Sequence, residues 1–383
     1  MIVTIVCDVL GEENNGTTIA AMNLIRYLKR QGHIVRILCA DQNKKGQENC
    51  WVVPNMNFGK TLNKYVEKVG VTLAKPVEDI IRDCIKGSDV VHILIPLYLS
   101  MNAIKIAKEY DIPMTASFHM QAENLTSYFK LNNVKFINTA VYKIIYKYVY
   151  QYVDKIHFPT KFIEEIFEKN IKKTTPGCVI SNGVNDYVKK ENIEKPLEYQ
   201  NKIVILTTGR YAREKSQDTL IKAIYHSKYK DKIQLILGGQ GIKEKEYRKL
   251  AKNLPIQPLF KFYSRTEIID VLNYSDIYVH PAEIELEGIS CIEAIACGKL
   301  TIVSNSKLSA TKEFAVDERC IFKCRKPKDL ARVIDYWIDH PEEKKIIEDK
   351  YLHSALAFNQ EKCMEKMEQM LFDAIKVHKN QEK

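Results

Sequence analysis

Ile2-Val-Thr-Ile-Val-Cys7 and Gly32-His-Ile-Val-Arg-Ile-Leu-Cys39 are two short apolar runs, separated by a helical pattern over residues 17–31. Short apolar runs of this kind predict buried strands, and apolar residues repeating every three to four positions predict an amphipathic helix. A strand, a helix and a second strand in this order imply parallel strands whose sheet is covered by helices.

The same alternation continues along the chain and restarts after residue 200. In the first half, strands are expected at residues 89–95 and 113–118, with a helix at 102–109. In the second half, strands are expected at residues 203–207, 233–237, 276–280 and 300–304, with a helix at 216–226. The fold class is therefore α/β, with two doubly wound parallel sheets.

The chain has 383 residues, which suits two domains of roughly 150–200 residues each. Residues 172–201 are polar, are interrupted by proline and glycine and contain no long periodic element, so the domain junction is expected there. The boundaries predicted are 1–178 for an N-terminal, acceptor-binding domain and 179–359 for a donor-binding domain. A C-terminal helix, about residues 360–383, is expected to join the first domain.

The composition is that of a globular protein with a basic surface. Hydrophobic residues make up 45%, charged residues 28%, and the formal net charge is +10. No apolar run approaches the ~20 residues of a membrane-spanning helix, and the N-terminus is interpreted as a strand instead of a signal peptide. Ten cysteines without short-spaced pairs favour free thiols in a reducing cytoplasm. The charge alone leaves nucleic acid, an anionic membrane surface and an anionic substrate open.

Gly209-Arg-Tyr-Ala-Arg-Glu-Lys215 lies between a predicted strand and a predicted helix. Such a loop, with glycine and several cations, suits a diphosphate: Arg210 offers a planar fork of donors and Lys215 a compact charge. Fixed cations also stabilise the negative charge that grows on a leaving diphosphate. A basic turn in which Glu214 pairs with its neighbours explains the same residues.

Glu285-Leu-Glu-Gly-Ile-Ser-Cys-Ile-Glu293 follows another predicted strand. A glycine before a helix lets an anion approach free backbone N–H groups, so Gly288 predicts a phosphate site at that helix start. Carboxylates accept hydrogen bonds from sugar hydroxyls. Glu285 is therefore expected at a hexose and Glu293 at a ribose. The alternative is a solvated acidic loop followed by a glutamate that the helix dipole favours.

These motifs together resemble the GT-B-fold retaining glycosyltransferases of family four. The resemblance rests on Glu285 and Glu293 followed by Ala294-Ile-Ala-Cys-Gly298, on the loop 209–215, on Val179-Ile-Ser-Asn-Gly-Val184 and on Gly238-Gly-Gln-Gly241. It implies two Rossmann-like domains facing across a cleft and the transfer of a sugar from a nucleotide-diphosphate donor.

The resemblance also implies roles for individual residues. Arg210 and Lys215 would bind the donor diphosphate, Glu285 the transferred sugar, the backbone amides of Gly288, Ile289 and Ser290 its phosphate, and Glu293 the ribose. His119, in Ser117-Phe-His-Met120, matches the family's catalytic histidine near the anomeric carbon, and Gly16, in Asn14-Asn-Gly-Thr17, its glycine loop near the diphosphate. By itself, a histidine at a strand end is typical of a hydrogen-bonded structural residue.

No metal or other cofactor is expected. The chain has no D-x-D pair, which metal-dependent transferases use to hold a divalent ion on the diphosphate. Cations and a helix start would take the place of that ion. The resemblance implies retention of the anomeric configuration, with attack by the acceptor on the face that the diphosphate leaves.

Residues 136–152 alternate tyrosine and lysine with isoleucine and valine, and nine lysines against four acidic residues lie between residues 130 and 173. Tyrosine and lysine on an apolar helix favour an anionic membrane interface. A core helix whose lysine heads reach water is the alternative, and a nucleic-acid partner is not favoured because no binding motif accompanies the pattern.

Residues 117–123 and the following helix resemble the bacterial enzymes that glucosylate diacylglycerol. A lipid acceptor is therefore preferred, with glucose from UDP-glucose as the donor sugar and a location in the cytoplasm, peripheral on the inner face of the membrane. The alternatives are a cell-envelope polysaccharide acceptor, a GT-B-like sugar-nucleotide epimerase and a non-catalytic sugar-nucleotide sensor.

Overall fold

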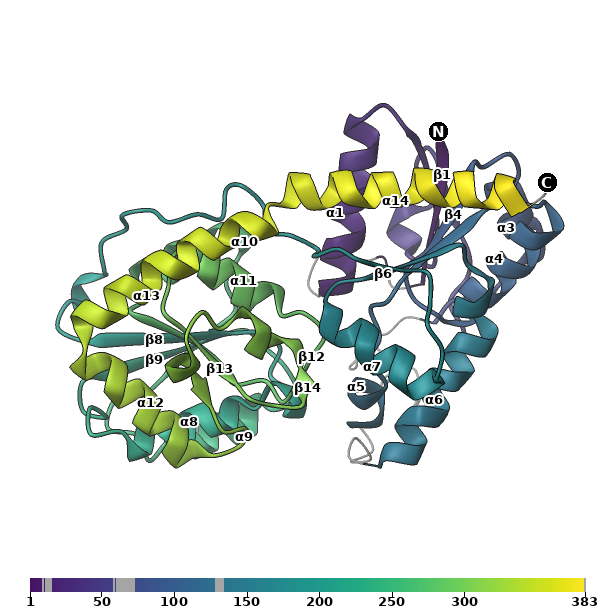
Figure 1. Cartoon of the computed structure of the whole chain (residues 1–383). Coiled ribbons are helices and arrows are strands. Elements are labelled where there is room, and N and C mark those ends of the chain that lie inside the picture. Colours follow the sequence, from purple (N-terminus) through teal and green to yellow (C-terminus); the bar gives the residue numbers. More distant parts are fainter. Residues whose placement is uncertain (9, 11–15, 58, 60–72, 128–133, 382–383) are drawn as a thin grey trace. The chain divides into compact units, whose positions relative to one another are not determined.

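The computed structural model describes residues 1–8, 10, 16–57, 59, 73–127 and 134–381 (Figure 1). The chain divides into two compact units, Met1–Asn182 with Glu361–Lys383, and Gly183–Gln360. The first unit runs to Asn182, four residues beyond the expected domain boundary at 178. The reason is that a last short strand at 177–179 belongs to the first sheet.

The first unit is built on a seven-stranded parallel sheet in the order β3-β2-β1-β4-β5-β6-β7. Its strands are β1 (Ile2–Cys7), β2 (Ile34–Cys39), β3 (Cys50–Val52), β4 (Val90–Ile93), β5 (Met114–Ser117), β6 (Lys155–Phe158) and β7 (Gly177–Val179). Its longer helices are α1 (Gly16–Arg30), α3 (Glu78–Ile85), α4 (Tyr98–Glu109), α5 (Ala122–Ser127), α6 (Lys135–Tyr148), α7 (Lys161–Ile171) and α14 (Gln360–Gln381). Short 3₁₀ turns lie at Gln42–Lys44 and Tyr150–Tyr152.

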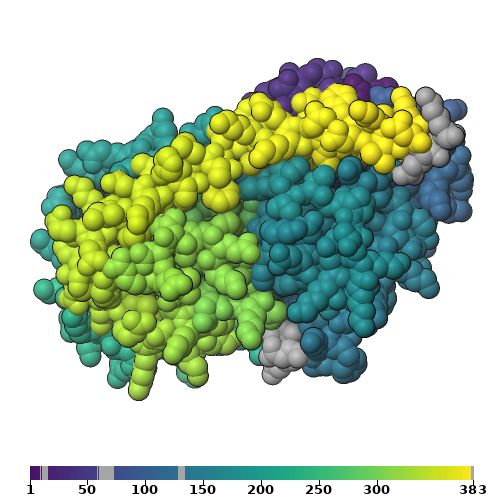
Figure 2. All heavy atoms as spheres, viewed as in Figure 1, coloured from purple at the N-terminus to yellow at the C-terminus, as the bar shows by residue number. Residues whose placement is uncertain are grey.

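The C-terminal helix α14 completes the first unit. Met364, Met367 and Leu371 are buried in the same core cluster as Leu24 and Leu28 of α1. At the rim of this contact, Glu368 accepts a hydrogen bond from the Tyr27 hydroxyl at 3.1 Å. Flexible methionine side chains suit such a contact because they adapt to the irregular surface of a neighbouring helix. In Figure 2, α14 (yellow) covers part of this unit's surface.

The second unit holds a six-stranded parallel sheet in the order β10-β9-β8-β11-β13-β15, and a two-stranded ribbon β12-β14. The strands are β8 (Ile203–Thr208), β9 (Ile233–Gly238), β10 (Leu259–Lys261), β11 (Ile277–His280), β12 (Ile284–Glu285), β13 (Thr301–Ser304), β14 (Leu308–Ser309) and β15 (Ile321–Phe322). The helices are α8 (Gln217–His226), α9 (Glu244–Ala251), α10 (Arg265–Tyr274), α11 (Ile289–Ala296), α12 (Pro327–Asp339) and α13 (Pro341–Ser354). Shorter 3₁₀ turns lie at Leu197–Tyr199, Arg213–Lys215, Ala310–Phe314, Glu318–Cys320 and Ala355–Phe358.

The predicted fold class and every strand predicted from an apolar run are confirmed. The central strands β1, β8 and β9 are buried along almost their whole length, which explains their continuous apolar sequences. The prediction missed edge strands such as β3, β7 and β10, which are only three residues long. It also missed β6, whose sequence Lys-Ile-His-Phe contains two polar residues.

Candidate functional site

Two loops of the second unit begin side by side at the carboxyl edge of its sheet. The strand order reverses between β8 and β11, because β9 and β10 lie on one side of β8 and β13 and β15 lie beyond β11. Open α/β sheets bind ligands outside the carboxyl ends of their strands at such a reversal. The loops that leave β8 and β11 there carry Lys215 and Glu285.

Glu285 lies at the centre of a charged cluster in this position. Its carboxylate forms an ion pair with the Lys215 ammonium group, although the two residues are 70 positions apart. Nε2 of His280, the last residue of β11, lies 3.1 Å from the same carboxylate. The structure therefore brings together two residues that the sequence assigned to a diphosphate and to a sugar, and adds a histidine that the sequence analysis missed.

The cluster keeps Glu285 ionised. Burial by itself would raise the pKa of this carboxyl, but Lys215 and His280 outweigh it and lower the pKa to about 2. An ionised carboxylate accepts hydrogen bonds only, so the His280 Nε2–H donates to it. Glu285 can thus accept hydrogen bonds from hydroxyl groups while it holds the Lys215 cation in place.

Helix α11 starts directly behind this cluster. Its N-cap, Gly288, has φ = 89°, a conformation that side chains rarely adopt, and an added Cβ would lie 2.7 Å from Thr311 Cγ2 and 3.2 Å from Glu285 Cγ. The amides of Ile289 and Ser290 belong to the first turn, where no carbonyl of the helix accepts from them. This helix start can therefore receive an anion beside Lys215.

Glu293, one turn into α11, is buried and faces a second cation. Nη1 of Arg265, the first residue of α10, lies 2.5 Å from Glu293 Oε1. Burial raises the pKa of Glu293, and the Arg265 charge opposes that effect. The sequence analysis missed Arg265, although its place just after β10, at the start of a helix, is the kind of position where open sheets carry ligand-binding residues.

The loops after β8 and β9 are joined closely. Gly209 N donates to Gly238 O and Tyr211 N donates to Gln240 O, both at 2.9 Å. A Cβ on Gly239 would lie 2.1 Å from Gly209 O. Only glycine permits this approach, which explains the glycine turn recognised in the sequence and fixes the backbone that carries Arg210.

Arg210 pairs with Glu214, as expected if the loop is a basic turn in which Glu214 pairs with its neighbours. Its Nη2 lies 2.8 Å from Oε1 of Glu214, which is buried, while half of the arginine side chain remains exposed. Glu283, in the loop before β12, pairs with Arg325 at 2.5 Å. Glu283 thus has a different partner from Glu285, which pairs with Lys215.

In the first unit, His119 follows the carboxyl end of β5 and is half-buried. It lines a small cavity of about 10 Å³ together with Ser117, His157 and Asn182. Burial, with lesser effects from His157 and His92, holds the pKa of His119 well below its usual value, so the ring is neutral. Gly16 is the first residue of α1, whereas Asn14 and Asn15 of its motif lie outside the described residues.

The buried histidines of this unit make its stability depend on pH. Burial lowers the pKa of His92 to about 3 and that of His157 to about 4, below the ~6.5 of an unfolded histidine. Below pH 6.5 the unfolded state therefore binds more protons, and folding stability is lost as the pH falls towards 4. The expected loss is about 2 kcal/mol per histidine at pH 5. Asp8 acts in the opposite direction, because burial raises its pKa to about 7.

The two tryptophans allow the pH dependence of folding stability to be measured for the first unit alone. Trp51 lies in β3 of the first unit and Trp337 in α12 of the second, so Trp337→Phe leaves Trp51 to report on the first unit. Denaturant unfolding of this parent and of its His92→Gln derivative is compared at pH 7 and pH 5. The derivative is expected to lose less stability on acidification, and an equal loss in both proteins would contradict the assignment.

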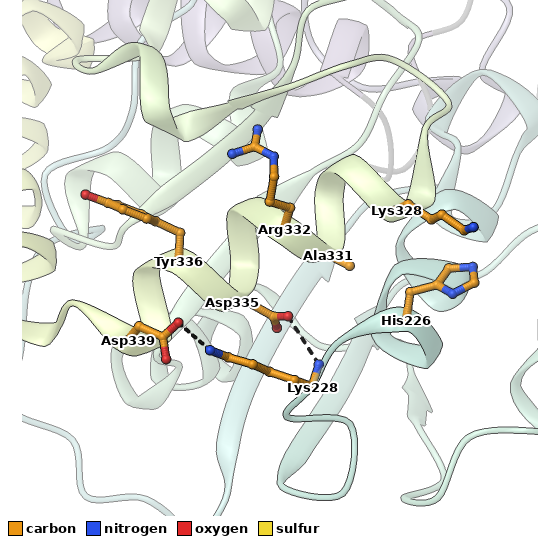
Figure 3. A pocket seen from close by; sticks show the side chains of 8 residues that line it. All are labelled: His226, Lys228, Lys328, Ala331, Arg332, Asp335, Tyr336 and Asp339. Carbon is orange, nitrogen blue, oxygen red and sulfur yellow. Dashed lines mark hydrogen bonds and ion pairs between the residues drawn. The ribbon is translucent and has the colours of Figure 1, made fainter.

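A larger groove of about 590 Å³ lies between the carboxyl end of α8 and α12 (Figure 3). Its polar groups bind one another: Lys228 Nζ lies 2.6 Å from Asp339, and Lys228 N donates to Asp335 at 3.2 Å. The groove is at the opposite end of α8 from Lys215 and is lined by none of the predicted site residues. These pairs hold α8 against α12.

Among the described residues, no helix is both long enough and apolar enough to cross a membrane.

Comparison with known proteins agrees with this geometry. The chain matches the family described as Glycosyltransferase Family 4 over residues 14–187 and the family described as Glycosyl transferases group 1 over residues 188–351. The alpha-monoglucosyldiacylglycerol synthase of Streptococcus pneumoniae (strain ATCC BAA-255 / R6) is 21% identical over 310 residues, which cover 76% of this chain and 68% of that protein. The enzyme of the same name from Acholeplasma laidlawii is 23% identical over 315 residues, or 76% of each chain.

Among solved structures, Anabaena Alr3699/HepE in complex with UDP-glucose aligns over 97% of this chain and 100% of its own, with a TM-score of 0.75 and 15% sequence identity. At that identity the likeness shows a shared fold. The two family matches meet at residues 187 and 188 and follow the order of the two units. The chain therefore belongs to the GT-B-fold glycosyltransferases of family four, in which a Family 4 domain precedes a group 1 domain.

Proposed function

We propose that this protein is a retaining glycosyltransferase that moves a hexose, with UDP-glucose as the first candidate donor, to a membrane lipid such as diacylglycerol. The observation that carries the donor half is the Lys215–Glu285–His280 cluster beside the start of α11. At the edge of the sheet where ligands bind, this cluster combines a cation, a carboxylate that can accept hydrogen bonds from hydroxyl groups, and the free amides of a helix start. The complex of Anabaena Alr3699/HepE with UDP-glucose supports this choice of donor.

In the proposed reaction, the bond between the anomeric carbon and the phosphate oxygen breaks, and its electron pair leaves with the nucleoside diphosphate. Lys215, Arg210 and the amides of Ile289 and Ser290 stabilise that charge. An acceptor hydroxyl forms the new bond on the same face and gives its proton to the departing phosphate.

In this proposal Glu285 holds the sugar hydroxyls, with His119 near the anomeric carbon. Glu293 holds the ribose, and Gly16 lies near the diphosphate. The cations and the helix start remove the need for a metal ion.

The surface of α6 supports a lipid acceptor. Phe136, Ile144 and Tyr148 are 75%, 52% and 49% exposed, while Tyr142 and Ile145 face the core. Ile144 and Tyr148 are four positions apart and Phe136 is eight positions before Ile144, so all three lie on the solvent side of the helix, together with the exposed Lys143 and Lys147. An apolar stripe edged by lysines suits the surface of an anionic membrane. The printed names of the two bacterial relatives, both glucosyldiacylglycerol synthases, point to the same class of acceptor.

Replacing Phe136, Ile144 and Tyr148 together with serine is expected to lower binding to anionic vesicles at low salt at least tenfold. The reason is that about 25 cal/mol is lost for each Å² of apolar surface that no longer enters the interface. Co-sedimentation with vesicles containing phosphatidylglycerol measures the effect.

The matched control replaces Ile346 and Leu356, which are 59% and 67% exposed on the second unit, and is expected to bind as the parent does. Equal binding by the α6 variant and the parent would contradict the membrane surface. In that case α6 would be a core helix whose lysine heads reach water.

The function is tested by incubating the protein with a panel of nucleotide sugars and with lipid and soluble acceptors, with and without EDTA, and identifying products by mass spectrometry. Transfer of hexose to diacylglycerol in the presence of EDTA, with the anomeric configuration kept, is expected. Transfer to a polyprenol-linked saccharide alone would replace the lipid acceptor by a cell-envelope one, as in the Campylobacter jejuni relative, an N-acetylgalactosaminyltransferase named for an undecaprenol-linked substrate. An epimerised nucleotide sugar formed without any acceptor would refute the proposal.

A further inference from the structure

Four polar side chains form a continuous hydrogen-bonded chain inside the first sheet. Thr115 Oγ1 lies 2.7 Å from His92 Nδ1, and His92 Nε2 lies 3.0 Å from Ser117 Oγ. Ser117 Oγ lies 2.8 Å from His157 Nδ1, and His157 Nε2 lies 2.6 Å from the carbonyl oxygen of Ile180. The chain crosses β4, β5 and β6, where His92 pairs with Thr115 and Ser117 with His157 in the strand register.

The last link sets the direction of all the others. A carbonyl oxygen only accepts, so His157 Nε2 carries a proton and donates it. The fully buried ring of His157 is neutral, because burial lowers its pKa to about 4, so its Nδ1 accepts from the Ser117 hydroxyl. Ser117 Oγ then accepts from His92 Nε2–H, and His92 Nδ1 accepts from Thr115. Each group has one defined role, and a proton added to His157 would reverse the links back to Thr115.

His119 lies against the end of this chain. Its ring and that of His157 are 5.7 Å apart between centroids and inclined by 75°. Both nitrogens of His157 are already engaged, by Ser117 and by Ile180, so the contact leaves the nitrogens of His119 unused. Among the described residues, no hydrogen bond to either nitrogen of His119 is formed.

Among the described residues that line the cavity beside His119, none carries a carboxylate, an ammonium or a guanidinium group. The cavity wall contributed by α1 is Ala20 and Leu24, and that contributed by α14 is Met364 and Met367. The titratable groups that act on His119 are His157 and His92. The charge beside His119 is therefore that of the His157 ring, whose hydrogen bonds come from the chain through Ser117 and His92.

We propose that His92, Ser117 and His157 are positioning residues for His119: their one-directional chain holds the His157 ring fixed and neutral, so that His119 keeps one orientation and both nitrogens available. This rests on the proposed function, in which His119 lies near the anomeric carbon of the donor. Ser117 is the critical link because its single hydroxyl joins the two histidines. Without it, neutral His157 loses the donor that fixes its ring, and a cationic His157 would have no hydroxyl to accept from its Nδ1–H.

Ser117→Ala tests this in the full-length protein, with Ser100→Ala as the matched control. Ser100 is equally buried in the same unit and donates one hydrogen bond, to Ile95 O at 2.6 Å, but lies outside the chain. Ser117→Ala is expected to lower kcat between tenfold and about 10²-fold, to leave the KM for UDP-glucose within twofold, and to move the acid limb of the pH–kcat profile to lower pH, because the cation of His157 loses its hydrogen-bond acceptor. Ser100→Ala is expected to change none of the three. Equal profiles for the two variants would overturn the proposal.

Nitrogen-15 spectra of the histidine rings give a readout that does not depend on activity. In the parent at pH 6, His157 and His92 are expected as neutral rings protonated at Nε2, and in Ser117→Ala the signal of the unprotonated His157 Nδ1 is expected to shift, because the hydroxyl that donates to it is gone. A parent that shows these ring states but transfers no sugar would refute the proposed function and not the hydrogen-bonded chain of His92, Ser117 and His157. A cationic His157 in an active parent would refute that hydrogen-bonded chain and not the proposed function.

Discussion

Glu285→Gln is expected to lower kcat for sugar transfer by about 10²–10³-fold, equivalent to about 2.7–4 kcal/mol of lost transition-state stabilisation. The substitution keeps the shape of the side chain but removes the charge that holds Lys215, because the amide oxygen that can still accept from Lys215 and His280 is neutral. The KM for the donor is expected to change only a few-fold, because the amides of α11 and Glu293, which are proposed to bind the nucleotide, are unchanged. Initial rates over a range of UDP-glucose concentrations separate the two parameters.

Lys215→Ala is expected to have an effect of similar size, because the cation beside the leaving diphosphate is lost. Since the two side chains act as a pair, the double variant Lys215→Ala/Glu285→Ala is expected to be little worse than either single one. Glu283→Gln is the matched control: it removes a carboxylate from the same loop, but one that is paired with Arg325. Additive losses in the double variant would show that Lys215 and Glu285 act independently, and an equal loss in Glu283→Gln would show that the loop as a whole is responsible.

Gly288→Ala is expected to lower kcat/KM for the donor by at least 10²-fold, the scale of loss caused by misplacing a substrate by about 1 Å. With φ at 89°, an alanine costs about 1–3 kcal/mol in backbone strain. Its Cβ would also lie 2.7 Å from Thr311 and 3.2 Å from Glu285 Cγ, so either the start of α11 or Glu285 must move. Both belong to the proposed phosphate and sugar sites.

Gly298→Ala separates strain from function. Gly298 follows the other end of the same helix with φ = 64°, and the nearest atom to an added Cβ is Lys190 Cδ at 3.2 Å, in a flexible side chain. Both variants are expected to lower the free energy of unfolding of the second unit, followed by Trp337 fluorescence in a Trp51→Phe background. Gly288→Ala alone is expected to lose UDP binding measured by calorimetry. Retained UDP binding in Gly288→Ala would rule out the start of α11 as the phosphate site.

The motifs of the proposed donor site can be read from the sequence because each is contiguous. The loop 209–215 follows one apolar run, Glu285 and Gly288 follow another, and the parallel sheet aligns the ends of both runs at one edge. His280 and Arg265 were missed for a different reason. Each is a single polar residue at an element boundary, and nothing local distinguishes it from a solvated residue until its partner, Glu285 or Glu293, is known.

The sequence by itself determined the α/β class, the division into two units and the central strands, since apolar periodicity is a local property that burial on both faces of a parallel sheet imposes directly. It also identified the two loops that are proposed to carry the donor-binding residues. Only the tertiary structure decided which charges meet, because Lys215 and Glu285 are 70 positions apart and pair only once β8 and β11 are neighbours. It likewise decided the histidine chain, because the register of β4, β5 and β6 aligns His92, Ser117 and His157, and a register between strands cannot be read from their separate sequences.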